Sequence, residues 1–562
     1  MRILALLLLL STACAEQYTP PDPPEPPPGP SPTAVFLTPA QHLTRASMAL
    51  RGMRPTVDDL RAVEADPAAL PAIVDRYLSS PAFAETIKEL HNETLLLRVE
   101  QPQMTYPAVG PLATATALQI NRGLFDEPLR LIEDIVMSDQ PYTKIVTANY
   151  TMANGVTAAI WGLPHAGAPD IWERTTFPDG RPAAGILATS AFHHRWRSTG
   201  FNYNRGRANE ISRALLCHDF LASDIQIDTS VDLSDPEVVA NAVIANSSCA
   251  GCHQTLDPLA SYLFVFRGSL APVAVDTYPV TYYQPGSLNR WRTTNKRPPM
   301  FFGEDTGGMG GLGEVIARDP RFARCTAQRF ASYFSEVPQS AVSPAWIARL
   351  QTALTSEWSA KQLAKAIVLS DEFRISHDSD DTRAETTVGT LKVRPEQLGR
   401  MLRDLTGFSW TTTTAARLRG IPYGTANLFE SDFIGFRVLA GGIDSYFVTE
   451  PVHTMNATSS LVAKTAAAAA ADFVVDRELV APIADRKLFV EAEITTADPA
   501  RIRAQLAYLH ARIYGELVAA DSPEVDASYE LYTAAFTETA DRARTWKLVL
   551  VGMLSDFRSL FY

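Results

Sequence analysis

Residues 248–254 read SCAGCHQ, and this stretch says more about the 562-residue chain than any other. It places Cys249, Cys252 and His253 in the order C-x-x-C-H, the attachment pattern of a c-type haem. Two thiols at this spacing reach the two vinyl groups on one edge of a porphyrin, and the adjoining imidazole then binds the iron. The pattern predicts one haem c, attached through both cysteines and coordinated by His253.

The residues before the motif favour this interpretation over two alternatives. Residues 234–244 read SDPEVVANAVI, a polar cap, a proline and an apolar run, which predicts a helix. A thioredoxin-like cysteine pair would instead follow a β-strand, and a zinc site would need ligands that no second C-x-x-C or H-x-x-x-H pair supplies. Haem is our prediction, with the redox pair and zinc as the alternatives.

The sixth ligand of the iron is less well defined. A methionine or a second imidazole is usual in an electron carrier. Met309 is our first choice because its flanking glycines allow close approach to a flat ring, and Met300 is the alternative. His193, His194 or an open site are further options, and either methionine alone could be a core residue.

The N-terminus predicts export. Residues 1–13 read MRILALLLLLSTA, one basic residue, an apolar run and small residues, which is the layout of a signal peptide. Cys14 ends the sequence LSTAC, which resembles the lipobox of bacterial lipoproteins, with Ser11 where that family prefers Leu. We expect Cys14 to carry a lipid anchor, with simple cleavage as the alternative, and the proline-rich residues 14–33 to form an extended stalk.

The five cysteines divide by role. If Cys14 takes lipid and Cys249 and Cys252 take haem, Cys217 and Cys325 are left over. In an oxidising compartment a disulfide between these two is the expected outcome, and two buried free thiols are the alternative.

Composition and motifs exclude several classes of function. The net charge of −12 is spread along the chain, so we expect no nucleic-acid partner. The sequence contains no G-x-S-x-G, H-E-x-x-H, phosphate-loop or dinucleotide pattern. Hydrolases and nucleotide-binding enzymes of those types are therefore not expected.

The motif and its flanks also carry a family resemblance. Residues 249–259 read CAGCHQTLDPL, RGR occurs at 205–207 and DPRFARC at 319–325. Together they resemble the cytochrome-c-like module of large secreted bacterial proteins built from domains of unknown function, over roughly residues 35–375. Ala260 stands where that family has Gly. The resemblance implies haem c binding and extracytoplasmic redox chemistry, and Cys217 and Cys325 match its recurrent cysteines.

The rest of the chain predicts amphipathic helices joined by polar corners. Four corners, near residues 80, 319, 370 and 556, combine a capping Ser or Asp with a phenylalanine that would anchor in the core. Residues 43–52 and 398–407 form a weak repeat in which each helix ends in glycine. Residues 193–197, HHRWR, are expected in a polar surface turn, with the lining of a haem pocket as the alternative.

Residues 268–313 lack helical periodicity and predict a long structured loop. Its basic residues would either pair with haem propionates or, as we prefer, lie on a solvated surface; they are Arg290, Arg292, Lys296 and Arg297.

The predicted fold is mainly α, a helical multi-domain protein with a cytochrome-c-like haem module and long loops. The expected divisions are a signal peptide (1–13), lipidated Cys and stalk (14–33), an N-terminal helical domain (34–184), the haem module (185–335), a helical segment closing it (336–385) and a C-terminal helical domain (386–562).

The expected function is electron transfer at the cell envelope to an unidentified redox partner protein. The protein would be an outer-membrane lipoprotein or would lie in the periplasm or at the cell surface. One alternative is a haem peroxidase or oxidase that uses His193, His194 or Arg195 as a distal group. The other is a structural helical lipoprotein scaffold.

Overall fold

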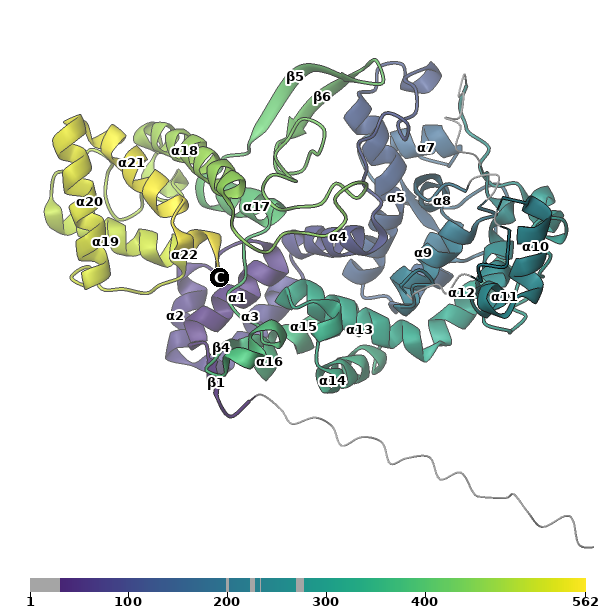
Figure 1. The fold of residues 1–562 in the computed structure, drawn as a ribbon. Helices are drawn as coiled ribbons and strands as arrows, with labels where there is room; N and C mark the ends of the chain where they lie inside the picture. Colours follow the sequence, from purple (N-terminus) through teal and green to yellow (C-terminus); the bar gives the residue numbers. More distant parts are fainter. Residues whose placement is uncertain (1–30, 199–201, 223–227, 233, 269–276) are drawn as a thin grey trace, which may run out of the picture.

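The computed structural model describes residues 31–198, 202–222, 228–232, 234–268 and 277–562, and helices dominate this part of the chain (Figure 1). The prediction of a mainly α protein is therefore confirmed. The predicted signal peptide, Cys14 and most of the proline-rich segment lie outside the described residues. Among the described residues, no helix is both long enough and apolar enough to cross a membrane.

The helices of the described residues fall into three groups along the chain. The first group comprises α1 (Pro39–Arg51), α2 (Val57–Ala65), α3 (Leu70–Leu78), α4 (Pro81–Leu95), α5 (Ala117–Met137), α6 (Lys144–Thr147) and α7 (Gly155–Trp161). The middle group comprises α8 (Ser190–Arg195), α9 (Arg205–Leu216), α10 (Pro236–Ala245), α11 (Ser247–Ser261), α12 (Met309–Arg318), α13 (Pro320–Ser335), α14 (Pro344–Thr355), α15 (Ala360–Val368) and α16 (Asp371–Arg374). The last group comprises α17 (Pro395–Thr406), α18 (Ala457–Val480), α19 (Pro499–Leu509), α20 (Pro523–Thr539), α21 (Arg542–Leu554) and α22 (Phe557–Leu560).

The strands of the described residues form three small antiparallel pairs. They are β1 (Ala34–Phe36) with β4 (Ile375–Asp378), β2 (Thr151–Ala153) with β3 (Glu173–Thr175), and β5 (Thr411–Leu418) with β6 (Ile421–Asn427). The β5–β6 hairpin projects from the helical body and packs beside α5 (Figure 1).

Buried apolar residues form two clusters. The first runs from α1 to residue 391 and includes the β5–β6 hairpin, and the second is built mainly from α17 to α22. The predicted divisions at 184/185 and 335/336 fall inside the first cluster, whereas the division near 386 falls between the two. Helices α10 and α11 lie at one end of the molecule and α18 to α21 at the other (Figure 1).

The four predicted corners all begin helices, because a Ser or Asp side chain accepts a backbone N–H at the start of α4, α13, α16 and α22. Phe83, Phe322 and Phe373 are buried, as expected. Phe557 is 64% exposed, so the prediction of a core anchor is wrong there. The reason is register: Phe557 directly follows its cap, Asp556, whereas the other three stand three residues after theirs.

The two repeated segments become α1 and α17, which both end at a left-handed glycine. Helix α1 starts with a capping box, and at the start of α17 the side-chain oxygen of Gln397 accepts the N–H of Arg394 at 2.9 Å. They pack against each other: Gln397 Nε2 donates to the carbonyl of Met48 at 3.1 Å, and Arg400 Nε donates to that of Arg51 at 3.0 Å. A Cβ on Gly52 would lie 2.9 Å from the Gln397 Cα. Glycine is therefore needed there both for its backbone angle and for this close approach.

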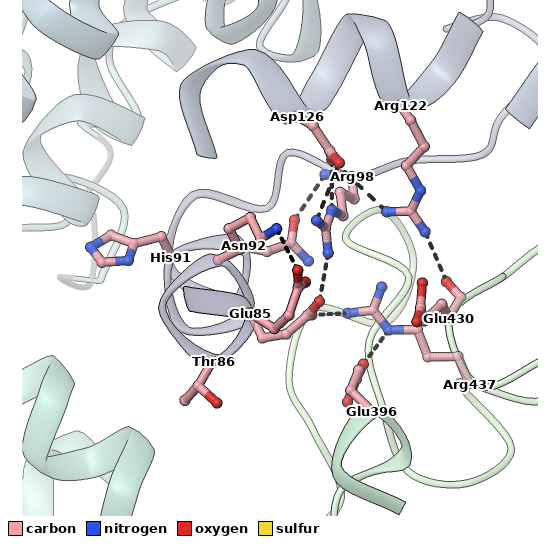
Figure 2. A network of polar contacts seen from close by, with 12 residues as sticks. Glu85, Thr86, His91, Asn92, Arg98, Arg122, Asp126, Glu396, Glu430 and Arg437 are labelled. Atoms are coloured by element: carbon pink, nitrogen blue, oxygen red, sulfur yellow. Dashed lines mark hydrogen bonds and ion pairs between the residues drawn. The ribbon is translucent and has the colours of Figure 1, made fainter. Parts of the chain in front are cut away.

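A buried network of ion pairs joins α4 and α5 to α17 and to the loop after β6 (Figure 2). Arg98 pairs with Glu89 at 2.5 Å and with Asp126 at 2.7 Å. Arg437 pairs with the same Glu89 at 3.2 Å and with Glu396 at 2.6 Å. Burial alone would raise the pKa of Glu89, but Arg98 and Arg437 lower it to about 2. The network therefore stays charged and fixes the C-terminal part on the first helical body.

Candidate functional site

The C-x-x-C-H motif occupies the first two turns of α11. Asn246 ends α10 and caps α11, since its side-chain oxygen accepts the N–H groups of Ser248 at 3.0 Å and Cys249 at 3.4 Å. Cys249, Cys252 and His253 stand at positions i, i+3 and i+4 of one helix. This spacing puts both thiols and the imidazole on the same face of α11.

The described cysteines differ in bonding. Cys217 and Cys325 form a disulfide, with a Cα–Cα distance of 5.3 Å, which is the pairing that the sequence predicts. Cys249 and Cys252 are both unbridged and half-buried. Two thiols on one helix face are therefore available for a shared reaction partner.

His253 is held in one orientation by a hydrogen bond to a buried carboxylate. Its Nδ1 lies 3.0 Å from Oδ1 of Asp257, one turn further along α11. Asp257 is fully buried and accepts both Nε (2.6 Å) and a terminal nitrogen (3.0 Å) of Arg205 on α9. Burial would raise the pKa of Asp257, but the hydrogen bonds from His253 and Arg205 lower it.

The ionised Asp257 selects the histidine tautomer. A carboxylate can only accept, so the proton of neutral His253 belongs on Nδ1. No hydrogen bond joins its Nε2 to any residue that the structure describes, and the side chain is 22% exposed. The lone pair of Nε2 is therefore free to bind a metal, in the arrangement usual for metal-ligating histidines.

The segment carrying Met300 lies along the second half of α11. Asn295 Nδ2 donates to the carbonyl of Asp257 at 3.2 Å, and the Met300 N–H donates to that of Pro258 at 3.4 Å. Met309 opens α12 instead, is 7% exposed and packs in the first apolar cluster. Of the two predicted sulfur ligands, Met300 thus belongs to the segment that touches the motif helix.

The expectation of a polar surface turn at residues 193–197 is wrong. His193, His194 and Arg195 are only 0%, 1% and 7% exposed. Each donates a hydrogen bond from a side-chain nitrogen to a main-chain carbonyl, and burial lowers the pKa of His194 to about 3. Neutral imidazole rings that donate such a hydrogen bond can pack in an apolar core. The apolar run of residues 184–192 was the signal for this burial.

The predicted loop and its basic residues are mostly as expected. The described residues from 277 to 308 contain the 3-10 helix η5 (Pro285–Arg292), and α12 begins at Met309, four residues before the predicted end. Arg290, Arg292 and Lys296 are exposed. Arg297 is half-buried and donates to the carbonyl of Val243 on α10 at 3.3 Å, so it braces α10.

Sequence analysis missed the pair of Asp257 and Arg205. The position of Asp257 was readable, because a residue four places after His253 faces the same side of a helix. Arg205 is distant in sequence from both, and only the packing of α9 on α11 brings it to the carboxylate.

Comparison with known proteins adds no relative. No family model, no curated protein and no solved structure matches the chain. Within the described residues, no group of three or more His, Cys, Asp and Glu side chains is arranged to hold a metal ion. A haem iron needs fewer protein ligands than a bare metal ion does. The porphyrin supplies four ligands, and the chain needs to supply only the axial ones.

Proposed function

We propose that the chain is an extracytoplasmic c-type haem protein that carries electrons at the cell envelope. The observation that carries this proposal is the geometry of α11. It presents two unbridged thiols and an imidazole on one face, with Nδ1 of that imidazole tied to a buried carboxylate and Nε2 left open. The donor set fits covalent haem attachment.

Each residue then has one task. Cys249 and Cys252 would hold the porphyrin through thioether bonds, and His253 would coordinate the iron through Nε2. Asp257 and Arg205 keep the imidazole in its tautomer and orientation. When bound, the haem supplies one-electron redox chemistry, for which the protein sets the potential through its axial ligands and their hydrogen bonds.

We propose a methionine as the opposite ligand. The contact between residues 295–300 and α11 supports Met300, and the glycine-flanked Met309, favoured on sequence grounds, is the alternative. Replacing each in turn by leucine and recording the optical spectrum of the oxidised protein separates the two. Only the replacement of the methionine that binds the iron should change the low-spin spectrum to a high-spin one.

We further propose that Cys14 carries a lipid anchor and that the proline-rich segment holds the haem body away from an outer membrane. This part rests on the sequence of residues 1–33. The redox partner would be another protein of the envelope.

The decisive experiment is expression with c-haem maturation machinery, followed by a haem-stained denaturing gel and a pyridine haemochrome spectrum. The native protein should show covalent pigment, and the double variant Cys249→Ala/Cys252→Ala should show none. Cys14→Ser is the matched control, because it also removes a thiol but should keep the pigment while releasing the protein from membranes. An exported, folded native protein without pigment would refute the haem proposal.

Burial of the distal candidates argues against the peroxidase or oxidase alternative. His193, His194 and Arg195 would have to supply a distal acid or base, yet each bonds a main-chain carbonyl in the core. The scaffold alternative predicts that the haem-free double variant retains all partner binding.

A further inference from the structure

A cavity of about 490 Å³ lies where α1, α4 and α17 meet, between the two apolar clusters. In Figure 1 these three helices lie toward the middle of the molecule, away from α11. The volume falls in the range of small-molecule sites. The side chains around it are unusually basic: Arg51, Arg400, Arg403 and Lys487 line it, against the two acids Glu85 and Asp404.

The two acids are already compensated by cations that do not line the cavity. Glu85 accepts from Lys88 at 2.8 Å, and Asp404 pairs with Arg512 at 3.2 Å. The positive charge of the lining side chains is therefore in excess.

Arg400 is the most buried of these cations, at 8% exposure. Its hydrogen bonds go to neutral acceptors, the Arg51 carbonyl at 3.0 Å and Thr86 Oγ1 at 3.3 Å. No described carboxylate lies within ion-pair distance of Arg400. Arg400 also helps to lower the pKa of Glu89, which lies beyond ion-pair distance. Burying a guanidinium without a directly bonded counter-charge is costly, which points to an anion that completes the site.

Arg51 and Arg403 repeat this pattern. Arg51 lies 3.5 Å over the ring of Tyr77 and donates to Ser47, while its buried Nε has no hydrogen-bond partner. Arg403 is exposed at the rim, and its side chain forms no ion pair or hydrogen bond with any described residue. Three guanidinium groups thus share one cavity, and none of them forms an ion pair with a described carboxylate, although Asp404 across the cavity acts on Arg51 at longer range.

The start of α4 adds to the positive electrostatic potential of the cavity. Ser80, Pro81 and Ala82 line the cavity, and α4 is 15 residues long. The N-terminus of a helix carries a partial positive charge and favours anions, so it acts in the same sense as the arginines.

We propose that this cavity binds a small multivalent oxyanion, a phosphate-bearing or polycarboxylate molecule. Guanidinium groups bind both kinds of oxygen pair in a two-pronged fashion, and three of them around one cavity suit an anion with several such groups. A bound anion would contact α1, α4 and α17 together. Binding would therefore stabilise the junction between the two apolar clusters.

Isothermal titration of the full protein with pyrophosphate and with citrate tests the proposal. At least one of the two should bind with a dissociation constant below about 1 mM, and the tighter one identifies the chemical source. Arg403→Gln should weaken that binding about tenfold, since it removes one charge-assisted contact. Lys487→Gln should act in the same direction.

The matched control is Arg544→Gln, an exposed arginine on α21 that has no side-chain partner among the described residues and does not line the cavity. It should bind as the native protein does. Absence of binding to either anion, or equal weakening by Arg403→Gln and Arg544→Gln, overturns the proposal. The test does not depend on haem, because the pigment of each variant is measured separately on the haem-stained gel.

Discussion

A single carboxylate, that of Asp257, orients the imidazole of His253. Two nitrogens of Arg205 donate hydrogen bonds to the same carboxylate. The chain therefore controls its proposed axial ligand through a neighbour on the same helix and a cation from another. In such arrangements the second partner influences the electron density of the ligand as well as its orientation.

Asp257→Asn should raise the reduction potential of the bound haem. The asparagine side chain keeps a hydrogen-bond acceptor but removes the negative charge that favours the oxidised iron. We expect a rise on the order of 60 mV, a tenfold change in the one-electron equilibrium. Spectroelectrochemical titration measures it, and Asp232→Asn, at an exposed site before α10, is the control. An unchanged potential would contradict the assigned role.

Glu127 offers a second test at this scale. It is fully buried in α5, its Oε1 accepts from Thr151 at 2.9 Å and its Oε2 has no partner. Burial raises its pKa from 4.5 to about 7. An acid with a raised pKa adds stability that is present below the unfolded pKa and is lost as the pH rises through the folded one.

Glu127→Gln should therefore leave the free energy of unfolding nearly unchanged near pH 4.5 and raise it at about pH 8, by on the order of 3 kcal/mol. Urea denaturation at both pH values gives the comparison. Glu64→Gln, at an exposed position of α2, should have no such pH-dependent effect. A destabilised Glu127→Gln protein at the higher pH would show that the buried carboxylate is stabilised in its charged form.

At the scale of elements, helix starts and ends follow the local sequence. Ser80, Asp319, Ser370 and Asp556 cap the predicted helices, and the glycines at 52 and 407 end α1 and α17. What local sequence did not give is which face each helix buries. The exposed Phe557 shows this, since a two-position change relative to the cap moves the ring out of the core.

The packing of α1 on α17 can be tested at Gly52. Its φ is +63°, and Gly180 has a similar φ of +72° with nothing within 4 Å of its Cβ position. Both Gly→Ala variants lose about 1 kcal/mol to backbone strain. Gly52→Ala should lose a further 1–3 kcal/mol, roughly, because its new methyl group meets Gln397. If urea denaturation showed the same loss of unfolding free energy for Gly52→Ala and Gly180→Ala, the close approach of α1 and α17 would be contradicted.

At the scale of the whole molecule, two long-range devices hold the helices together. The ion-pair network around Glu89 and Arg437 links the C-terminal part to α4 and α5 (Figure 2). The disulfide between Cys217 and Cys325 spans 108 residues and encloses the C-x-x-C-H helix. Both connect segments that are far apart in sequence.

Removing the disulfide with Cys217→Ala/Cys325→Ala should lower the free energy of unfolding by about 4 kcal/mol, because a long loop gains entropy in the unfolded chain. Guanidinium denaturation followed by circular dichroism measures the loss. The single variant Cys14→Ser should leave stability unchanged. A loss below about 1 kcal/mol would mean that packing alone orders this loop.

The sequence by itself determined the helical class, the caps, the corners and the helix before the C-x-x-C-H motif, because these depend on residues within a few positions of one another. It also singled out Cys217 and Cys325, since the motif and Cys14 accounted for the other cysteines.

Only the tertiary structure decided the hydrogen bonds from Arg205 to Asp257 and the gathering, between α1, α4 and α17, of arginines that form no ion pair. Each of these joins residues from separate helices. Which faces of two helices meet depends on the packing of the whole core, and no local pattern encodes it.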